Sequence, residues 1–174
     1  DLLDDLEHHN QMILSRVKTS GDDDLDKASW TKTSDEFKSG SLKGPFYSLD
    51  DLPFPKEIVR LLLRFAIWEQ HGGAVAPTCR NIDNGLQGRQ NMSIGMQFTT
   101  RPADIDAIIS LIRAVSEMFP GICLRGTTSD FKSAYRQATA NPLHAKFWVL
   151  AIFDPEKQRP CFAIAGAQLF GCSC

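Results

Sequence analysis

The sequence predicts an α+β fold in which helices pack against an antiparallel sheet. Residues 102–119 carry an apolar stripe with helical spacing, and residues 147–165 hold two apolar runs on either side of a polar turn. Two shorter segments, 79–84 and 122–131, are also predicted to be extended, the second because of its Ile, Leu and threonines. With 174 residues, 43% of them apolar, the chain is long enough to bury a core.

Residues 1–18 are predicted to form a short helix. Apolar side chains recur at Leu6, Ile13 and Val17, and basic residues at the end of the segment suit the helix dipole. Residues 19–43 are polar and are predicted to be mostly solvated linker. The run GDDDLD within them is assigned to the linker rather than to a metal site, because no second set of ligands accompanies it.

Residues 52–73 are predicted to form an amphipathic helix. Pro55 lies near the start and two glycines end the segment. The apolar residues with helical spacing are Ile58, Leu61, Leu62, Phe65 and Trp68.

The next segment is predicted to be a short strand at 79–84, the turn-rich loop GLQGRQN and a second strand at 93–98. A helix should follow at 102–119, with Pro102 and Asp104 in its first turn. Its apolar stripe consists of Ile105, Ile108, Ile109, Ile112, Val115 and Phe119.

The last third of the chain is predicted to contain a strand at 122–131, a helical turn or two at 133–140 and a hairpin. Asn141 and Pro142 should break the helical turns. The hairpin strands, 147–153 and 160–165, flank DPEKQR, where Pro155 has the position that a type I turn favours.

Composition restricts the functional class. A net charge of −2 and a pI near 6.1 give no overall basic field, so contact with nucleic acid would need a local patch. Five cysteines without a CxxC pair suggest reduced thiols in an intracellular protein, in either cytoplasm or nucleus, and do not predict a zinc site. The apolar runs are too short to span a membrane. Both ends are abrupt, which suggests a piece of a longer protein.

The run DFKSAYRQ is the main candidate for chemistry. Asp130 is predicted to lie at the end of a strand, directly before a helical segment, where a rigid element can hold a metal ligand. An aspartate in that position can equally be an ordinary helix cap worth ~1 kcal/mol. The residues by themselves leave both interpretations open.

DFKSAYRQ resembles the first catalytic motif of reverse transcriptases, in which an acid is followed four and five residues later by a small residue and an aromatic. Asp130, Ala134 and Tyr135 match. Downstream, the hairpin is followed by a glycine turn similar to the family's Leu-Pro-Phe-Gly segment, with Leu169 in place of the proline. Upstream, GSLKGPF, CRNIDNGLQGRQN and ADIDAIISLIR resemble, in order, segments of tyrosine-recombinase (DIRS-like) retrotransposon reverse transcriptases. The similarity covers roughly residues 40–174.

The resemblance implies the fingers and the first part of the palm of a right-hand polymerase, with an antiparallel palm sheet and packed helices. Residues 1–40 would be an N-terminal helix and linker, 41–101 a fingers-like region, and 102–174 the incomplete start of the palm. The paired aspartates of the family's second acidic motif would lie beyond Cys174, so the isolated chain is expected to be inactive.

The resemblance also implies site residues. Asp130 and the backbone carbonyl of Phe131 would bind two Mg²⁺ ions, with Mn²⁺ as an alternative. Backbone N–H groups of Ser133 and Ala134 would contact phosphate. Tyr135 would exclude the 2′-hydroxyl of ribonucleotides, or else be a core aromatic.

Three further residues are implied in nucleotide binding. Phe170 and Gly171 would shape the nucleotide pocket, although Gly171 can equally be a turn glycine. Arg80 would clamp the triphosphate. Its spacing to Asp83 is one residue shorter than the family pattern, so a plain surface arginine is the other interpretation.

The predicted activity is that of the parent protein, an RNA-directed DNA polymerase. Its partners would be an RNA or DNA template with a primer, and dNTPs, with no membrane and an open oligomeric state. The alternative is a polymerase-derived module without catalysis that binds nucleic acid or protein.

Overall fold

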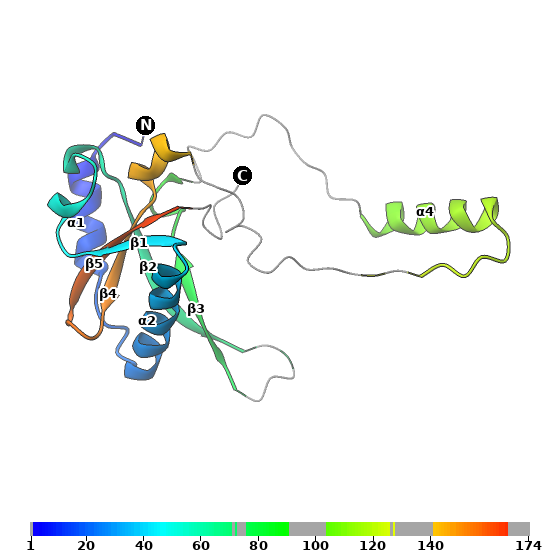
Figure 1. The fold of residues 1–174 in the computed structure, drawn as a ribbon, viewed down its shortest axis with the longest axis horizontal. Coiled ribbons are helices and arrows are strands. Elements are labelled where there is room, and N and C mark those ends of the chain that lie inside the picture. Colours follow the sequence, from blue (N-terminus) through cyan, green and yellow to red (C-terminus); the bar gives the residue numbers. More distant parts are fainter. Residues whose placement is uncertain are drawn as a thin grey trace. The chain divides into compact units, whose positions relative to one another are not determined.

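The computed structural model describes residues 2–70, 72, 76–90, 104–125, 127 and 141–166. The chain divides into two units, Asp1–Gly95 with Ser133–Cys174, and Met96–Lys132. The first unit contains α1 (Leu6–Arg16), α2 (Asp23–Lys38), β1 (Leu42–Phe46), β2 (Leu61–Glu69), β3 (Thr78–Asp83), β4 (Val149–Asp154) and β5 (Arg159–Ala165) (Figure 1). Short 3₁₀ helices occur at η1 (Leu49–Asp51), η2 (Lys56–Ile58) and η4 (Pro142–Phe147).

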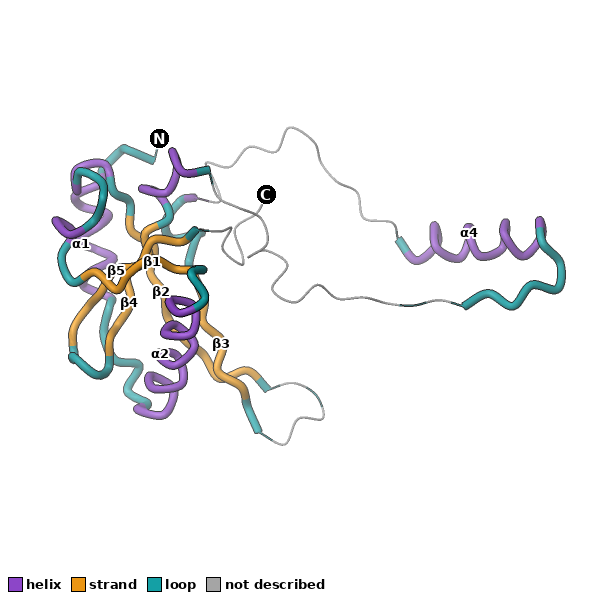
Figure 2. Tube along the Cα trace, in the orientation of Figure 1, coloured by secondary structure: helices purple, strands orange, loops and turns teal. Residues whose placement is uncertain are grey.

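The strands of the first unit form one five-stranded sheet in the order β1-β5-β4-β2-β3 (Figure 2). β2 and β4 pair in parallel, whereas β1–β5, β4–β5 and β2–β3 pair antiparallel. The predicted α+β class is confirmed. The sheet is mixed, however, and not wholly antiparallel as predicted, because β2 and β4 come from distant parts of the chain and enter the sheet in the same direction.

Both faces of the sheet are covered, one by α1 and the other by α2. Neighbouring strand residues point to opposite faces, so Leu61 packs with Ile13 of α1, whereas Leu62 belongs to the cluster beside Trp30 and Phe37 of α2. Leu61 and Leu62 are both fully buried. The core is therefore a helix–sheet–helix arrangement, which requires apolar residues at consecutive strand positions.

The prediction of a helix at residues 52–73 is wrong. That segment contains η2 and β2. A strand buried on both faces has a continuous apolar run, and such a run also contains the spacing of a helical stripe. The two prolines before it, Pro53 and Pro55, precede η2 and not a long helix.

The prediction of a linker at residues 19–43 is also wrong, because α2 occupies most of it. The Asp22 carboxylate accepts hydrogen bonds from the backbone N–H groups of Asp24 and Leu25, both at 3.0 Å. Three further acids lie in the first turn, where they suit the helix dipole. The acidic run is thus the capped start of a helix.

Several other predicted elements are confirmed. α1 lies within residues 1–18, β3 matches the strand at 79–84, and β4 and β5 form the predicted hairpin about residues 155–158. α4 (Ile105–Met118) lies within 102–119, and the Asp104 side chain accepts from the Ala107 N–H at 2.8 Å. Asn141 and Pro142 begin η4, where Asn141 caps the Leu143 N–H, so they start a helical segment as well as marking a boundary.

Two predicted elements fall outside the described residues, the strand at 93–98 and the helical turns at 133–140. The strand predicted at 122–131 lies there in part. Residues 122–125 and 127, which the structure describes, are not in a strand.

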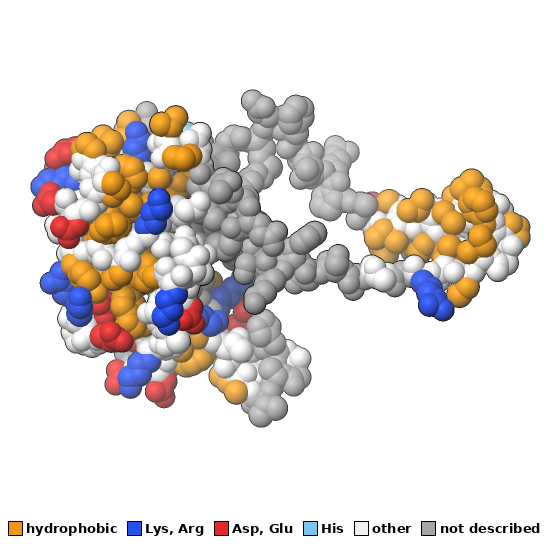
Figure 3. Space-filling view, in the orientation of Figure 1, with side chains coloured by type: hydrophobic (Ala, Val, Ile, Leu, Met, Phe, Trp, Pro, Cys, Tyr) orange, Lys and Arg blue, Asp and Glu red, His pale blue; other side chains and the backbone are white. Residues whose placement is uncertain are grey.

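The second unit contains α4. Hydrophobic side chains gather along this helix, while acidic and basic side chains are interspersed over the visible face of the first unit (Figure 3). None of the helices in the described ranges is long and apolar enough to cross a membrane. Cys79, Cys123 and Cys161 are free thiols.

Candidate functional site

Most of the predicted site lies outside the part of the chain that the structure describes. This holds for the predicted metal ligands and for the motif and glycine-turn residues that would contact the nucleotide, namely Asp130, Phe131, Ser133, Ala134, Tyr135, Phe170 and Gly171. Their roles stay predictions. Within the described residues, no three His, Cys, Asp or Glu side chains come together as a metal site would require.

Arg80, the remaining predicted site residue, lies on β3 opposite Ile67 of β2. Its Nη1 donates to Glu69 Oε1 at 2.7 Å, and both side chains are about one-third exposed. Because cross-strand partners point to the same side, Arg80 shares a face of the β2–β3 hairpin with Phe65, Ile67 and Ile82. We call these four residues the open hairpin face, since Phe65 and Ile67 are 40% and 41% exposed.

The opposite face of the hairpin is fixed to α2 by a buried ion pair. Arg64 of β2 donates to both carboxylate oxygens of Asp83 of β3, at 2.7 and 3.0 Å. Its Nη1 also donates to Glu36 and Thr33 of α2. Burial alone would lower the pKa of Arg64, but Asp83 and Glu36 outweigh it and raise this pKa, so the guanidinium stays charged in the core.

Neutral hydrogen bonds add to this attachment between α2 and β3. Ser29 Oγ donates to Asn81 Oδ1 at 2.8 Å, and Asn81 Nδ2 donates to Thr33 Oγ1 at 3.2 Å. Lys32 donates to the backbone carbonyl of Cys79. The hairpin therefore presents a polar, fixed face to α2 and the open hairpin face to the other side.

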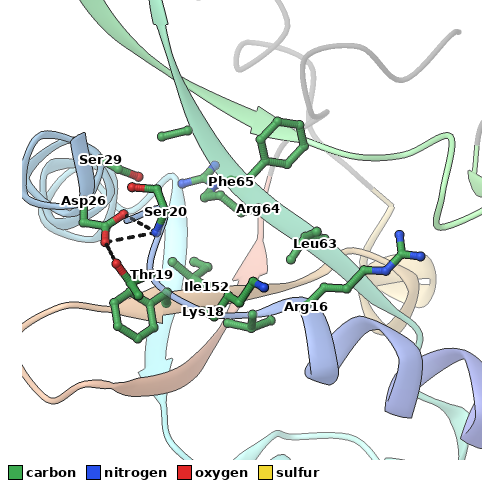
Figure 4. Close-up of a pocket in the computed structure, with 13 residues that line it drawn as sticks. Arg16, Lys18, Thr19, Ser20, Asp26, Ser29, Leu63, Arg64, Phe65 and Ile152 are labelled. Carbon is green, nitrogen blue, oxygen red and sulfur yellow. Dashed lines mark hydrogen bonds between the residues drawn. The ribbon is translucent and has the colours of Figure 1, made fainter. Parts of the chain in front are cut away.

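A cavity of about 300 Å³ lies where β2 and β4 part. The two strands pair only from Leu61 to Leu63, after which β2 continues with β3 and β4 with β5. Figure 4 shows Arg16, at the end of α1, and Lys18 lining this opening, with Asp26 and Ser29 of α2 on its other side.

The only acidic residue among the described residues that line this cavity is already engaged. Asp26 accepts from Thr19 Oγ1 at 2.6 Å and from the Ser20 N–H at 3.1 Å (Figure 4). Arg16 and Lys18 are exposed. The described lining includes hydroxyl groups and cations but no histidine or cysteine, so it could bind a polar or anionic group but offers no paired nucleophile and base.

A second polar cluster fixes the turn of the β4–β5 hairpin. Tyr47 Oη donates to Asp154 Oδ2 at 2.7 Å, and Asp154, 1% exposed, also accepts from the backbone N–H groups of Glu156 and Lys157. Lys157 Nζ lies 3.8 Å from the centre of the Tyr47 ring. Burial and the Asp154 carboxylate raise the pKa of Tyr47, which keeps the phenol in the form that donates to Asp154.

Sequence reasoning did not identify Arg64 and Asp83 as buried polar groups, nor Tyr47 as the partner of the buried Asp154. A signal was present for Arg64, because an arginine inside the apolar run LLLRFAIW must find a buried acid if that run enters a core. The helix interpretation removed this signal by assigning the run a solvent-facing side. No protein-family model, no curated protein and no solved structure matches the chain.

Proposed function

We propose that this chain belongs to an RNA-directed DNA polymerase of retroelement type, which adds dNTPs to a primer 3′ end on an RNA or DNA template. The observation that carries the proposal is DFKSAYRQ, at residues 130–137, within the ordered series of similar segments over residues 40–174. A series in a fixed order is less easily met by chance than one short motif.

The geometry of the described residues supports the proposal in two respects. The β2–β3 hairpin and the β4–β5 hairpin, which both belong to the region of resemblance, adjoin each other in one sheet through β2 and β4. Arg80 lies on the open hairpin face and is partly exposed, as a residue that contacts a triphosphate should be. A bound triphosphate would compete with Glu69 for its guanidinium.

The metal site is proposed from the sequence. Asp130 and the Phe131 carbonyl would hold Mg²⁺, or Mn²⁺ as an alternative, and both are hard oxygen ligands of the kind these ions prefer. When bound, the ions would activate the primer hydroxyl and neutralise charge on the triphosphate. Ser133, Ala134, Tyr135, Phe170 and Gly171 would contact the nucleotide, as the resemblance implies.

The test is primer extension by the parent protein, which under this proposal would carry the paired aspartates of the family's second acidic motif. The substitution Asp130→Asn should reduce Mg²⁺-dependent extension to background, because the amide cannot provide the negative charge that holds the ions. Asp104→Asn is the matched control, since asparagine caps a helix as well as aspartate does. Extension by Asp130→Asn at the unsubstituted rate would rule the proposal out.

A second candidate is a binding module without catalysis. It is favoured by the open hairpin face, where Phe65, 40% exposed, and the partly exposed Arg80 lie on the same side of two adjacent strands. An aromatic ring next to a cation suits stacking with single-stranded nucleic acid. Binding of a fluorescent single-stranded oligonucleotide that Phe65→Ala weakens, in a parent that extends no primer, would favour this candidate.

A further inference from the structure

We infer that Arg64 is a positioning residue that determines which face of the β2–β3 hairpin carries Arg80. Arg64 does not lie on the open hairpin face, and its donors are directed to Asp83, Glu36 and Thr33. Its influence on Arg80 would pass through the pairing of the two strands. The consequence for nucleotide binding rests on the proposed function, whereas the consequence for the hairpin does not.

The register of β2 against β3 decides where Arg80 points. Arg64 pairs with Asp83, and Ile67 pairs with Arg80. Because side chains alternate along a strand, a slip of one residue would turn Arg80 towards α2 and bring Cys79 onto the open hairpin face. In the present register Cys79 is 5% exposed.

The ion pair resists such a slip more strongly than the apolar cross-strand pairs do. Arg64 and Asp83 side chains are 1% and 4% exposed, so a shifted register would leave a guanidinium in the core opposite Ile82 or Asn84 instead of a carboxylate. A buried charge without its partner is strongly unfavourable. The pair Phe65–Ile82 is partly exposed and accommodates neighbouring registers more readily.

Contacts from α2 extend the same constraint to a third element. Glu36 and Thr33 bind the Arg64 guanidinium from the helix, so the position of β2 is fixed relative to α2 as well as to β3. The neutral bonds of Asn81 to Ser29 and Thr33 follow from that position. Near the far end of the hairpin, Trp68 Nε1 donates to Asp22 at 2.9 Å in an exposed contact.

Thiol labelling of the 174-residue chain tests the register without any assumption about activity. In Arg64→Met, which keeps the side-chain length and removes the charge, Cys79 should react with iodoacetamide about tenfold faster or more, as peptide mass spectrometry would show. Cys161, 0% exposed on β5, should stay protected. Ile13→Val, a mild core change in α1, is the control and should leave Cys79 protected.

Two outcomes of the labelling would overturn the inference. Cys79 could stay as protected in Arg64→Met as in the unsubstituted chain. Cys79 and Cys161 could become reactive together, which would show a general role in stability. If Arg64→Met does not fold, the milder Asp83→Asn replaces it, and the same comparison of Cys79 with Cys161 decides, since the amide keeps the shape but loses the charge.

Primer extension by the parent protein tests the consequence for nucleotide binding. Arg64→Met and Arg80→Gln should each raise KM for dNTP several-fold with little change in kcat, because both act on binding of the triphosphate. The double variant should be no worse than Arg80→Gln, since Arg64 acts through Arg80. Arg64→Lys, which keeps a charge, should restore part of the loss.

Failure of the proposed function and failure of the positioning role of Arg64 would give different results. A parent that extends no primer counts against the proposed function, and the labelling result still decides the role of Arg64. A parent that extends a primer, but in which Arg64→Met and Arg80→Gln have additive effects on KM, contradicts the positioning role and leaves the proposed function standing.

Discussion

His9 and Asn10 on α1 use their side chains to complete the backbone hydrogen bonding around the start of β2. His9 Nε2 lies 2.9 Å from the Leu61 carbonyl oxygen, to which it can donate. Asn10 donates to the Val59 carbonyl at 2.8 Å and accepts from the Leu61 N–H at 3.0 Å. Both side chains are buried, so α1 is attached to the sheet by polar contacts as well as by its apolar stripe.

The histidine makes this attachment sensitive to acid. Burial lowers the pKa of His9, and the nearby positive charges of Arg60, Arg89 and His8 lower it further, against the opposing effect of the hydrogen bond to Leu61. A His pKa below its unfolded value means that the unfolded state binds the proton more readily. The contribution of neutral His9 is therefore complete above about pH 6.5 and is lost as the pH falls through the folded-state pKa.

We predict that the free energy of unfolding falls more between pH 7.5 and pH 5 in the unsubstituted chain than in His9→Gln. Glutamine can donate to the Leu61 carbonyl but does not titrate. Urea unfolding followed by circular dichroism at the two pH values gives the comparison. His144→Gln is the control, because His144 is exposed and is not among the groups that shift the pKa of His9. An equal fall in the free energy of unfolding in His9→Gln and in the unsubstituted chain would contradict the role of His9 in acid sensitivity.

Tyr135 carries the prediction that concerns substrate choice in the proposed polymerase. In the parent protein, Tyr135→Val should raise the ratio of ribonucleotide to deoxynucleotide incorporation roughly tenfold or more, because the smaller side chain leaves room for a 2′-hydroxyl. Single-nucleotide extension with rNTP and dNTP measures the ratio. Tyr47→Phe, which alters a tyrosine beside the β4–β5 turn, should leave it unchanged. An unaltered ratio in Tyr135→Val would return that residue to the core-aromatic interpretation.

At the level of elements, β1 and β5 approach each other closely at Gly44. A Cβ atom added there would lie 2.8 Å from the Phe162 carbonyl oxygen, and the Gly44 φ of +141° is one that other residues rarely adopt. Gly40 also has a positive φ, of +76°, but an added Cβ there would meet nothing within 4 Å. Gly44 thus combines backbone strain with steric overlap, whereas Gly40 has a positive φ without overlap.

We predict that Gly44→Ala lowers the free energy of unfolding by about 2–4 kcal/mol, and Gly40→Ala by about 1 kcal/mol. The difference measures the cost of moving β1 away from β5 at the Phe162 carbonyl. Thermal and urea unfolding of both variants would provide the two values. Equal losses would mean that β1 shifts without cost and that its contact with β5 is loose.

The prediction of a helix at residues 52–73 failed because a strand that is covered on both faces can show the apolar spacing of a helix. Leu61, Leu62 and Phe65 fit a helical stripe, but Leu61 and Leu62 face opposite layers of a core. Only the tertiary arrangement, with α1 and α2 on the two sides, distinguishes a doubly covered strand from a helix. The predictions of α1, α4 and the β4–β5 hairpin succeeded because local pattern, caps and turn residues agreed there.

The failure at α2 has a different cause. Its buried side is narrow, with Leu25 and Thr33 buried and Trp30 and Phe37 partly buried, so its composition is that of a solvated segment. The capping signal was nevertheless present at Asp22, two and three residues before the N–H groups that it binds. Of the candidate site, Arg80 stays a prediction, and its partner Glu69 could not be predicted, because that contact depends on the β2–β3 register.

For the whole molecule, the division into two units leads to a prediction about excision. Among the residues that the structure describes, the members of both core clusters lie outside Met96–Lys132. Replacing that unit with a flexible Gly/Ser linker should leave the first unit folded, because loop-closure entropy depends only weakly on loop length. Circular dichroism, together with slow labelling of Cys79 and Cys161, would test this.

The excised protein must retain a cooperative unfolding transition for this prediction to hold. A substitution within the first unit supplies the comparison, since Ile13→Ala removes a fully buried side chain and should lower its stability by about 2–5 kcal/mol. Loss of the transition on excision alone would show that the first unit depends on the second.

The parallel pairing of β2 with β4 also determines the order of events during synthesis. α1, α2 and the β2–β3 hairpin leave the ribosome early, yet Leu61 to Leu63 find their partners only when Val149 to Ala151 have been translated. Until then one edge of β2 is unpaired, and the apolar side chains on both sides of this strand lack their neighbours from β4 and β5. Nascent chains in this condition are prone to aggregation. A ribosome stalled before residue 149 should therefore carry a chain that binds chaperones. Chaperone binding should end when β4 and β5 have emerged.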